Sequence, residues 1–302
     1  MRRLTPWFAA AVLLAAIACS GSDATDPVAP TEQPDAARDP SPGADGASPA
    51  PADAAVPIDA GRDGAPVPSG AGCAGKRYKL CEDFESSTVG QTPTGWTVLD
   101  GYGANPPKTL VAADAFHSGA HALKTSSGVA GASRVQKSLA GLGATAGTNW
   151  GRIFFKVQSP APQLTSQGPH ATFVALQGNL RANELRVVDT QQATTGKIQL
   201  LANTPDDQCC TGTDFKYTLY EGTWHCAEWH VAPATQSYRF FLDGAEIAAL
   251  KFDYGAGSTK ANMPAAFTAV GLGTIFYTPT LPSPLVTWFD DLAIDDTQIG
   301  CQ

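Results

Sequence analysis

The chain has 302 residues, of which only 16% are charged, while glycine (30) and proline (23) are plentiful. This weakly charged, turn-rich composition is typical of exported all-β proteins rather than helical ones. The formal net charge of −8 leaves no basic surface for a phosphate backbone, which argues against a nucleic-acid partner.

The chain begins with a targeting segment. Arg2 and Arg3 precede a short apolar core, and the small residues after it end at Cys19. A cysteine at the first mature position resembles a bacterial lipoprotein signal, so we expect residues 1–18 to be removed and Cys19 to be lipidated. The protein is then exported and lipid-anchored to the cell envelope, at the outer membrane or cell surface. An ordinary secretory signal with an incidental cysteine is the alternative.

Residues 19–72 predict a disordered tether. They contain ten prolines, thirteen alanines and nine acidic residues, but no aromatic residue. Such a segment cannot bury enough apolar surface to offset its ordering entropy. The remaining 73–302 carry a net charge of only −3, from 16 Lys and Arg against 19 Asp and Glu. We therefore expect one folded domain over 73–302, nearly neutral and monomeric, that contacts a membrane only through the lipid.

The cysteines of this domain predict disulfides. Six are present, an even number, and in an exported domain this indicates up to three bridges among 15 possible pairings. We expect one of Cys209 and Cys210 to pair with Cys226, and Cys301 to pair with Cys73 or Cys81. A metal site is the competing interpretation, but there is no CxxC and no histidine at ligand spacing.

From Lys79 onward, short apolar runs broken by Gly, Pro, Asn and Asp indicate β-strands. Clear examples are 152–157, 171–176, 197–201 and 238–242. Between two such runs, Asp243-Gly244 is a hairpin signal, because both residues accept the positive φ of a type I′ turn. Sustained helical periodicity is absent from the sequence, so we predict roughly a dozen or more strands in a sandwich.

Five tryptophans of the domain are expected in the core rather than as sugar platforms, since large aromatic residues dominate sandwich interiors. They are Trp96, Trp150, Trp224, Trp229 and Trp288.

Several common catalytic motifs are missing from the sequence, namely GxSxG, HExxH and the glycine-rich phosphate loop. His225 and His230 are five residues apart and would face opposite sides of a strand, so they should not share a metal. The neighbours Asp290 and Asp291 should likewise alternate across the sheet. This disfavours a glycosidase, which needs two carboxylates on one face.

Seven segments, in order and spacing, resemble the fungal secreted cellulose-induced protein family and its relatives, the glucuronan lyases of polysaccharide lyase family 20. The most specific are Gly-x-Trp-x-Cys-x-Glu at 222–228 and Trp-Phe-Asp-Asp…Ile-Gly-Cys at 288–301. The others are 80–85, 116–123, 168–174, 184–186 and 242–246. The resemblance spans essentially all of 73–302 and implies a concanavalin A-like β-jelly roll with a groove on one sheet.

The resemblance also implies a structural calcium ion. In the jelly roll that the resemblance implies, the first and last strands lie side by side, so acids from both can contribute to one cage of six to eight oxygens. Glu85, Asp290 and a loop oxygen near Ser118 are the ligands we expect. The alternative is that these acids are solvated strand ends.

The chemistry implied is β-elimination on a uronic acid. A base removes the C5 proton while a neighbouring group neutralises the sugar carboxylate. By the matching motifs, His170 is the expected base and Arg186 the neutralising group, with the amide of Gln191 or Gln192 beside them. A tyrosine should also take part, but the motifs do not choose among Tyr217, Tyr220, Tyr238 and Tyr277. The alternatives are a packed histidine and an arginine that caps a strand face.

We therefore expect a surface-anchored protein that interacts with polysaccharide and cleaves a glucuronan-like polyuronate by β-elimination. A non-catalytic carbohydrate-binding protein and an envelope structural or adhesion lipoprotein are the alternatives. The slight negative charge of the domain does not favour a polyanionic substrate, unless a local cluster of Lys and Arg overrides it.

Overall fold

The computed structural model describes residues 72–102, 108–127, 131–163, 168–178, 184–204, 211–277 and 281–302. Residues 1–71, and with them the predicted signal, Cys19 and nearly all of the predicted tether, lie outside the described residues, as do Cys209 and Cys210. The helices of the described part are short 3-10 turns, η1 (Ala140–Ala146), η2 (Pro233–Thr235) and η3 (Ala248–Leu250). None of them has the length and apolarity that crossing a membrane requires.

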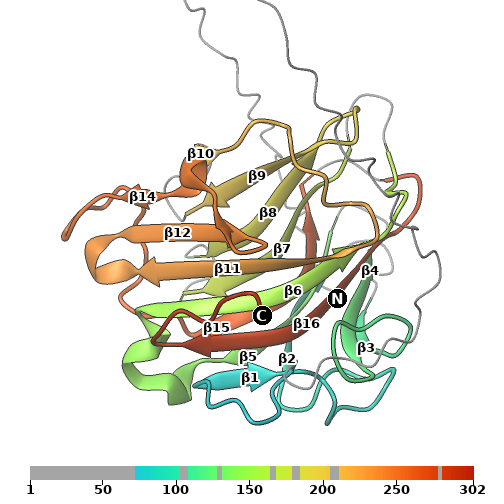
Figure 1. The fold of residues 1–302 in the computed structure, drawn as a ribbon, viewed down its shortest axis with the longest axis horizontal. Coiled ribbons are helices and arrows are strands. Elements are labelled where there is room, and N and C mark those ends of the chain that lie inside the picture. The colour runs from blue at the N-terminus through green and yellow to red at the C-terminus, as the bar shows by residue number, and fades with distance from the viewer. Residues whose placement is uncertain are drawn as a thin grey trace, which may run out of the picture. The chain divides into compact units, whose positions relative to one another are not determined.

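The described residues form two antiparallel sheets that pack face to face (Figure 1), which confirms the predicted all-β jelly-roll sandwich. The nine-stranded sheet has the order β13-β12-β11-β6-β16-β4-β3, with β1 paired to β16 and β14 to β12. Its strands are β1 (Leu80–Glu82), β3 (Thr109–Ala112), β4 (Ala122–Ser127), β6 (Asn149–Val157), β11 (Trp224–Ala232), β12 (Ser237–Leu242), β13 (Ala245–Glu246), β14 (Phe252–Asp253) and β16 (Leu285–Asp295).

The seven-stranded sheet lies behind it in Figure 1 and has the order β10-β9-β8-β7-β15-β5-β2. Its strands are β2 (Thr97–Tyr102), β5 (Ala132–Ser138), β7 (His170–Gln177), β8 (Leu185–Gln192), β9 (Ile198–Asn203), β10 (Thr211–Gly212) and β15 (Ala269–Phe276). The predicted runs at 152–157, 171–176, 197–201 and 238–242 fall in β6, β7, β9 and β12, as expected.

The core fills the space between the sheets because alternate side chains of each strand point inward. Phe155 of β6 and Phe289 of β16 are fully buried, and both pack against the equally buried Phe173 of β7. Their ring centroids lie 6.5 and 6.3 Å from that of Phe173. Burying such a side chain contributes roughly 1.5–3 kcal/mol, so these inward rows hold the sheets together and leave the outward rows available for other roles.

Two further predictions are confirmed, one for a turn and one for a long-range strand pairing. Asp243 and Gly244 have φ values of 50° and 82°, and they join Leu242 to its antiparallel partner Ala245 in a two-residue hairpin. The first and last strands are also neighbours, because Cys81 of β1 lies opposite Ala293 of β16.

The predicted disulfide pairings are wrong. The bridges are Cys73–Cys81 and Cys226–Cys301. The C-terminal segment returns to β11, where the Glu228 carboxylate accepts the backbone N–H of Ile299 at 3.0 Å and of Gly300 at 2.7 Å. This return brings Cys301 to Cys226, a contact that sequence spacing does not reveal.

The prediction for the tryptophans is only partly right. Trp96 and Trp229 are buried in the core, at 6% and 0% exposure. Trp150, Trp224 and Trp288 are instead half-buried on the nine-stranded sheet. Each of these three occupies an outward position of its strand, alternating with buried residues, and strand parity overrides the preference of a large aromatic side chain for the interior.

Candidate functional site

Polar side chains gather on the outer face of the seven-stranded sheet, across β7, β8 and the end of β15. His170 and Thr172 share one face of β7, where both lie beside Asp189, while Ala171 and Phe173 on the other face belong to the hydrophobic core. This alternation is what a strand with one packed face requires. We call His170, Thr172, Arg186, Asp189 and Tyr277 the His170 cluster.

His170 lies at the start of β7 with 23% of its side chain exposed. Its Nε2 atom is 3.3 Å from Asp189 Oδ1, but the oxygen is not placed to receive a hydrogen bond, and Nε2 is buried without a hydrogen-bond partner.

Asp189 of β8 is fully buried beneath this histidine. Its Oδ1 atom accepts a hydrogen bond from the Thr172 hydroxyl at 3.0 Å, and its Oδ2 atom accepts one from the Asn203 amide of β9. These donors come from β7 and β9, the two strands that flank β8. A carboxylate held from both sides in this way has a defined orientation toward His170.

Tyr277 follows β15 directly and lies between the histidine and the arginine. Its ring centroid is 4.9 Å from that of His170 and 4.3 Å from Arg186 Cζ, and its hydroxyl is 3.3 Å from Thr172 Oγ1. Burial raises the pKa of Tyr277 to about 12, against the opposing effects of the Arg186 charge and the Thr172 hydrogen bond. With this raised pKa the phenol stays protonated at neutral pH, and because the residue is 37% exposed it can still meet a ligand.

Arg186 of β8 is placed by an acidic neighbour. Its Nε atom is 3.4 Å from Glu184 Oε1, and the other oxygen of that carboxylate accepts hydrogen bonds from Arg134 at 2.8 Å and from Gln177 at 2.9 Å. Glu184 therefore ties β5, β7 and β8 together on this face. The Arg186 side chain remains 21% exposed beside the Tyr277 ring.

The two candidate glutamines have different places. Gln191 is directly opposite His170 on the neighbouring strand and is half-buried. Gln192 is buried and donates to Gly196 O at 3.3 Å. Of the two, only Gln191 lies beside the cluster on the outward face.

Among the four candidate tyrosines, the structure brings Tyr277 to His170. Tyr220 contacts the Thr190 hydroxyl at 2.5 Å, and Tyr238 donates to Val187 O at 3.3 Å, both in buried positions. Tyr217 packs at the rim of the core. Tyr277 reaches His170 because β15 pairs with β7, which is a tertiary contact. No sequence signal therefore distinguishes Tyr277 from the other three tyrosines.

Asp189 is a member of the cluster that sequence reasoning missed. It is three residues after Arg186, and an ideal strand would put the two on opposite faces. The pairing of β8 with β9 shifts register between Arg186 and Asp189. This irregularity, which has no plain sequence signature, puts both side chains on the outward face.

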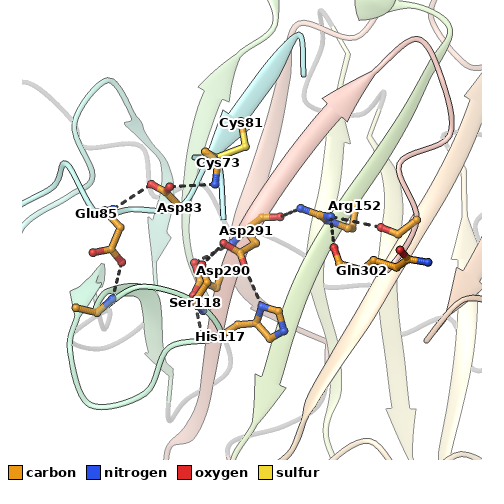
Figure 2. Close-up of polar contacts among 12 residues, drawn as sticks. Cys73, Cys81, Asp83, Glu85, His117, Ser118, Arg152, Asp290, Asp291 and Gln302 are labelled. Atoms are coloured by element: carbon orange, nitrogen blue, oxygen red, sulfur yellow. Dashed lines mark hydrogen bonds and ion pairs between the residues drawn. A yellow bond between two sulfur atoms is a disulfide. The ribbon is translucent and has the colours of Figure 1, made fainter. Parts of the chain in front are cut away.

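The predicted calcium ligands lie at the junction of β1, β16 and the loop before β4 (Figure 2). Asp290 accepts backbone N–H groups of His117 at 2.7 Å, Ser118 at 3.0 Å and Asp291 at 2.8 Å. Glu85 accepts those of Ala120 and His121, each at 2.8 Å. Both acids thus hold one loop, 117–121. Burial and the neighbouring Asp291 carboxylate raise the pKa of Asp290 to about 8.

Asp290 and Asp291 do not alternate across the sheet as predicted. Asp291 contacts the same loop, through Ser118 Oγ and His117 Nδ1, each at 2.6 Å. The pairing of β16 with β6 shifts register after Asp290, and Asp291 has a positive φ of 51°. This bulge turns both carboxylates to one side. We call His117, Ser118, Asp290 and Asp291 the Asp290 cluster.

The fit of a metal to these residues is limited in this structure. Their carboxylate oxygens accept N–H and O–H donors, and the described residues contain no group of three or more His, Cys, Asp or Glu placed to hold a metal ion. The calcium site stays a prediction, with Glu85, Asp290 and the backbone near Ser118 as its ligands. Binding would require these oxygens to exchange donors for the ion.

Sequence comparison finds neither a matching family model nor a matching curated protein. Solved structures do match. The cellulose-induced protein Cip1 superposes with a TM-score of 0.50 at 20% identity, covering 74% of this chain and 100% of that protein. An endo-β-1,4-glucuronan lyase from the fungus Trichoderma reesei gives 0.47 at 13% identity, covering 73% and 96%.

The alginate lyase Aly36B also gives a TM-score of 0.47, at 11% identity, covering 74% of this chain and 98% of that one. At 20% identity the similarity to Cip1 shows the fold alone. The scores of the two lyases are too low to add to it. The class defined here is therefore a jelly-roll sandwich with a polar cluster on one outer face.

Proposed function

We propose that the protein binds an acidic polysaccharide on the outer face of the seven-stranded sheet and cleaves it by β-elimination. The observation that carries this proposal is that His170, Tyr277 and Arg186 lie together. The Tyr277 ring centroid is 4.9 Å from that of His170 and 4.3 Å from Arg186 Cζ. A base, an acid and a cation within one exposed cluster are the groups that elimination of a uronate needs.

In the proposed step His170 takes the proton from C5 of the uronate. The electron pair left behind forms the C4–C5 double bond, the bond from C4 to the glycosidic oxygen breaks, and that oxygen takes the Tyr277 hydroxyl proton. The raised pKa of Tyr277, about 12, supports its role as the acid, because the phenol is protonated at neutral pH. The base is then the imidazole of His170, since histidine is the side chain that most often serves as a general base.

Asp189 supports the base. When His170 takes the C5 proton it becomes a cation, and the buried carboxylate 3.3 Å away stabilises that charge. We assign Asp189 a positioning role, since it lies beneath the histidine and away from the exposed surface.

Arg186 and Gln191 are proposed to receive the sugar carboxylate. Neutralising this group makes the C5 proton more acidic. The guanidinium is 3.4 Å from Glu184 Oε1, so the substrate carboxylate would compete with Glu184 for Arg186. Glu184 has Arg134 and Gln177 as further donors, and it therefore keeps partners when the substrate binds.

The lyase proposal is tested by the unsaturated sugar that elimination creates. Purified protein is incubated with glucuronan and with alginate, and absorbance near 235 nm is followed. We expect an increase that Tyr277→Phe and His170→Gln abolish and that Tyr217→Phe, which removes a hydroxyl away from the cluster, leaves intact. No increase with either polymer, while the polymer still retards the protein in an affinity gel, would replace the lyase by a carbohydrate-binding protein. The absence of both would favour an envelope structural module.

We further propose that the protein is exported as a monomer and anchored through Cys19. The two disulfides support export, since such bridges persist in oxidising compartments. Substituting Cys19→Ala should release the protein from the membrane fraction, and mass spectrometry of the mature N-terminus should show an acylated cysteine in the unmodified chain.

A further inference from the structure

The outer face of the nine-stranded sheet carries a straight row of residues across five neighbouring strands. In antiparallel register, Leu110 of β3 lies opposite Lys124 of β4, which lies opposite Trp288 of β16. Trp288 lies opposite Lys156 of β6, and Lys156 lies opposite Trp224 of β11. We call these five residues the Lys–Trp row. All of them are half-buried at outward positions of their strands.

The centre of the row is held in place. Trp288 donates from Nε1 to Asp114 Oδ1 at 2.9 Å, and Asp114 also pairs with the Lys124 ammonium. The ammonium groups of Lys124 and Lys156 lie 5.3 and 5.7 Å from the Trp288 ring centroid, on its two neighbouring strands. Contacts of this kind hold both cations close to the indole.

A shallow pocket continues the row at β3. It has a volume of about 360 Å³ and shares Leu110, Lys124 and Asp114 with the surroundings of the row. Exposed Lys108 and Val89 also line it, the latter 48% exposed. The pocket therefore combines an apolar lining with two cations, Lys108 and Lys124, that could meet the carboxylate of an acidic sugar.

The row has a positive local charge in a domain that is slightly negative. Lys124 and Lys156 of the row and Lys108 of the adjoining pocket contribute three cations, and Asp114 compensates one of them. Within the described part of the chain, no carboxylate forms an ion pair with Lys156. The strands bearing Lys124 and Lys156 are two spacings apart, about 10 Å, so separate carboxylates of an extended polyanion can reach the two lysines.

We propose that the Lys–Trp row and the adjoining pocket bind a chain of acidic sugars, on the face of the sandwich opposite the His170 cluster. The lysines would take separate carboxylates, and the half-buried Trp224, Trp288 and Leu110 would contact the apolar faces of the rings. The inference does not depend on the lyase chemistry. It gives the protein a second contact with the polymer, which would raise the residence time of the chain at the His170 cluster.

The test uses affinity electrophoresis in gels that contain alginate or glucuronan, with neutral hydroxyethylcellulose as the reference polymer. The background carries His170→Gln and Tyr277→Phe, so cleavage cannot alter the gel. Retardation by the acidic polymers is expected to persist in this background. Adding Lys124→Glu and Lys156→Glu should weaken the affinity roughly tenfold, the effect of losing charge-assisted contacts.

The matched control is Lys251→Glu with Lys260→Glu, the same charge change at exposed positions near η3 and β14. This control should weaken binding less than roughly twofold, as expected for cations outside the contact. Because Lys124→Glu faces Asp114, the milder pair Lys124→Gln and Lys156→Gln and the variant Trp288→Leu are measured as well, with near-ultraviolet circular dichroism as the check of folding. Each should weaken binding if folded.

Three results would overturn the proposal. They are equal loss of binding in the control pair, equal retardation by the neutral polymer, and unchanged binding in the folded row variants. None of these bears on the absorbance test, which reads the His170 cluster alone. A lack of elimination in the unmodified protein would in turn leave the gel result standing.

Discussion

The His170 cluster and the Asp290 cluster are built alike but complete their contacts differently. Each places a partly exposed histidine near a buried aspartate, 3.3 Å apart for His170 and Asp189 and 2.6 Å apart for His117 and Asp291. In the Asp290 cluster the carboxylates accept three backbone N–H groups, a serine hydroxyl and a ring nitrogen. In the His170 cluster a ring nitrogen is left without a hydrogen bond.

The difference shows how polar clusters can be told apart by their partners. Acids that accept N–H groups of one loop stabilise that loop, and their removal should cost folding energy. Partly exposed side chains beside an exposed phenol can meet a ligand, and their removal should cost activity. The first pattern describes Asp290 and Glu85, and the second describes His170 and Tyr277.

The largest expected effect is on activity. Tyr277→Phe should reduce the rate of elimination by about 10²- to 10⁴-fold, the usual contribution of a general acid or base. The ring is retained, so the denaturant midpoint should change little. Rates are measured at 235 nm alongside Tyr217→Phe, and a rate that stays within a few-fold of the unmodified protein would remove Tyr277 from the mechanism.

The second effect is on stability. Asp290→Ala should lower the free energy of unfolding by about 3 kcal/mol or more, because three backbone donors lose their acceptor. Asp290→Asn, which keeps one acceptor oxygen, should cost less. Urea unfolding measures the loss, with Asp296→Ala as the control. The Asp296 side chain is 58% exposed, so its removal should change the free energy of unfolding by less than about 0.5 kcal/mol. Equal costs for Asp290→Ala and Asp296→Ala would contradict the structural role of Asp290.

Calcium is expected to stabilise the loop that Asp290 and Glu85 hold. If the ion binds at Glu85, Asp290 and the backbone near Ser118, a concentration 100 times its dissociation constant should add about 2.7 kcal/mol to stability. Thermal unfolding is followed with calcium, with magnesium and with a chelator. Calcium alone should raise the midpoint, and Glu85→Gln should remove the response. The same midpoint in all three solutions would refute the calcium prediction.

The smallest effect concerns the tyrosines at high pH. Burial raises the pKa of Tyr238 above its ordinary value of 10, as it does for Tyr277 and Tyr220. The protonated form is therefore favoured by folding, so this stability is fully present below pH 10 and is lost as the pH rises toward the folded pKa.

At pH 10.5, Tyr238 alone should lower the free energy of unfolding by about 0.8 kcal/mol. Urea unfolding at pH 9 and 10.5 measures this loss, and Tyr238→Phe should reduce it. A free energy of unfolding that stays constant or rises over this interval would be the opposite of the expected sign.

The sequence predicted what depends on neighbouring residues. Alternating apolar runs place the strands, because each strand must bury one face. Asp243-Gly244 predicts its own turn, since both residues tolerate positive φ. The motifs also selected His170, Arg186 and Gln191, and these lie around the same outer surface, although their roles are still to be tested.

The predictions that were wrong or missing concern strand irregularities and long-range contacts. The bulge at Asp291 turns two neighbouring acids to one side, and the register shift before Asp189 adds that acid to the cluster of His170. Neither changes the local pattern of residue types. The pairing of Cys226 with Cys301 depends on the path of the C-terminal segment across β11.

The amino-acid sequence alone was sufficient to predict a β-sandwich, because period-two burial and turn chemistry are local properties. The even number of cysteines in the domain was sufficient to predict disulfides, though not their pairing. The folded structure was needed to show which tyrosine contacts His170, which acids share a face and which tryptophans reach the surface. These depend on register between strands distant in the chain, and register is set by the packing of the whole core.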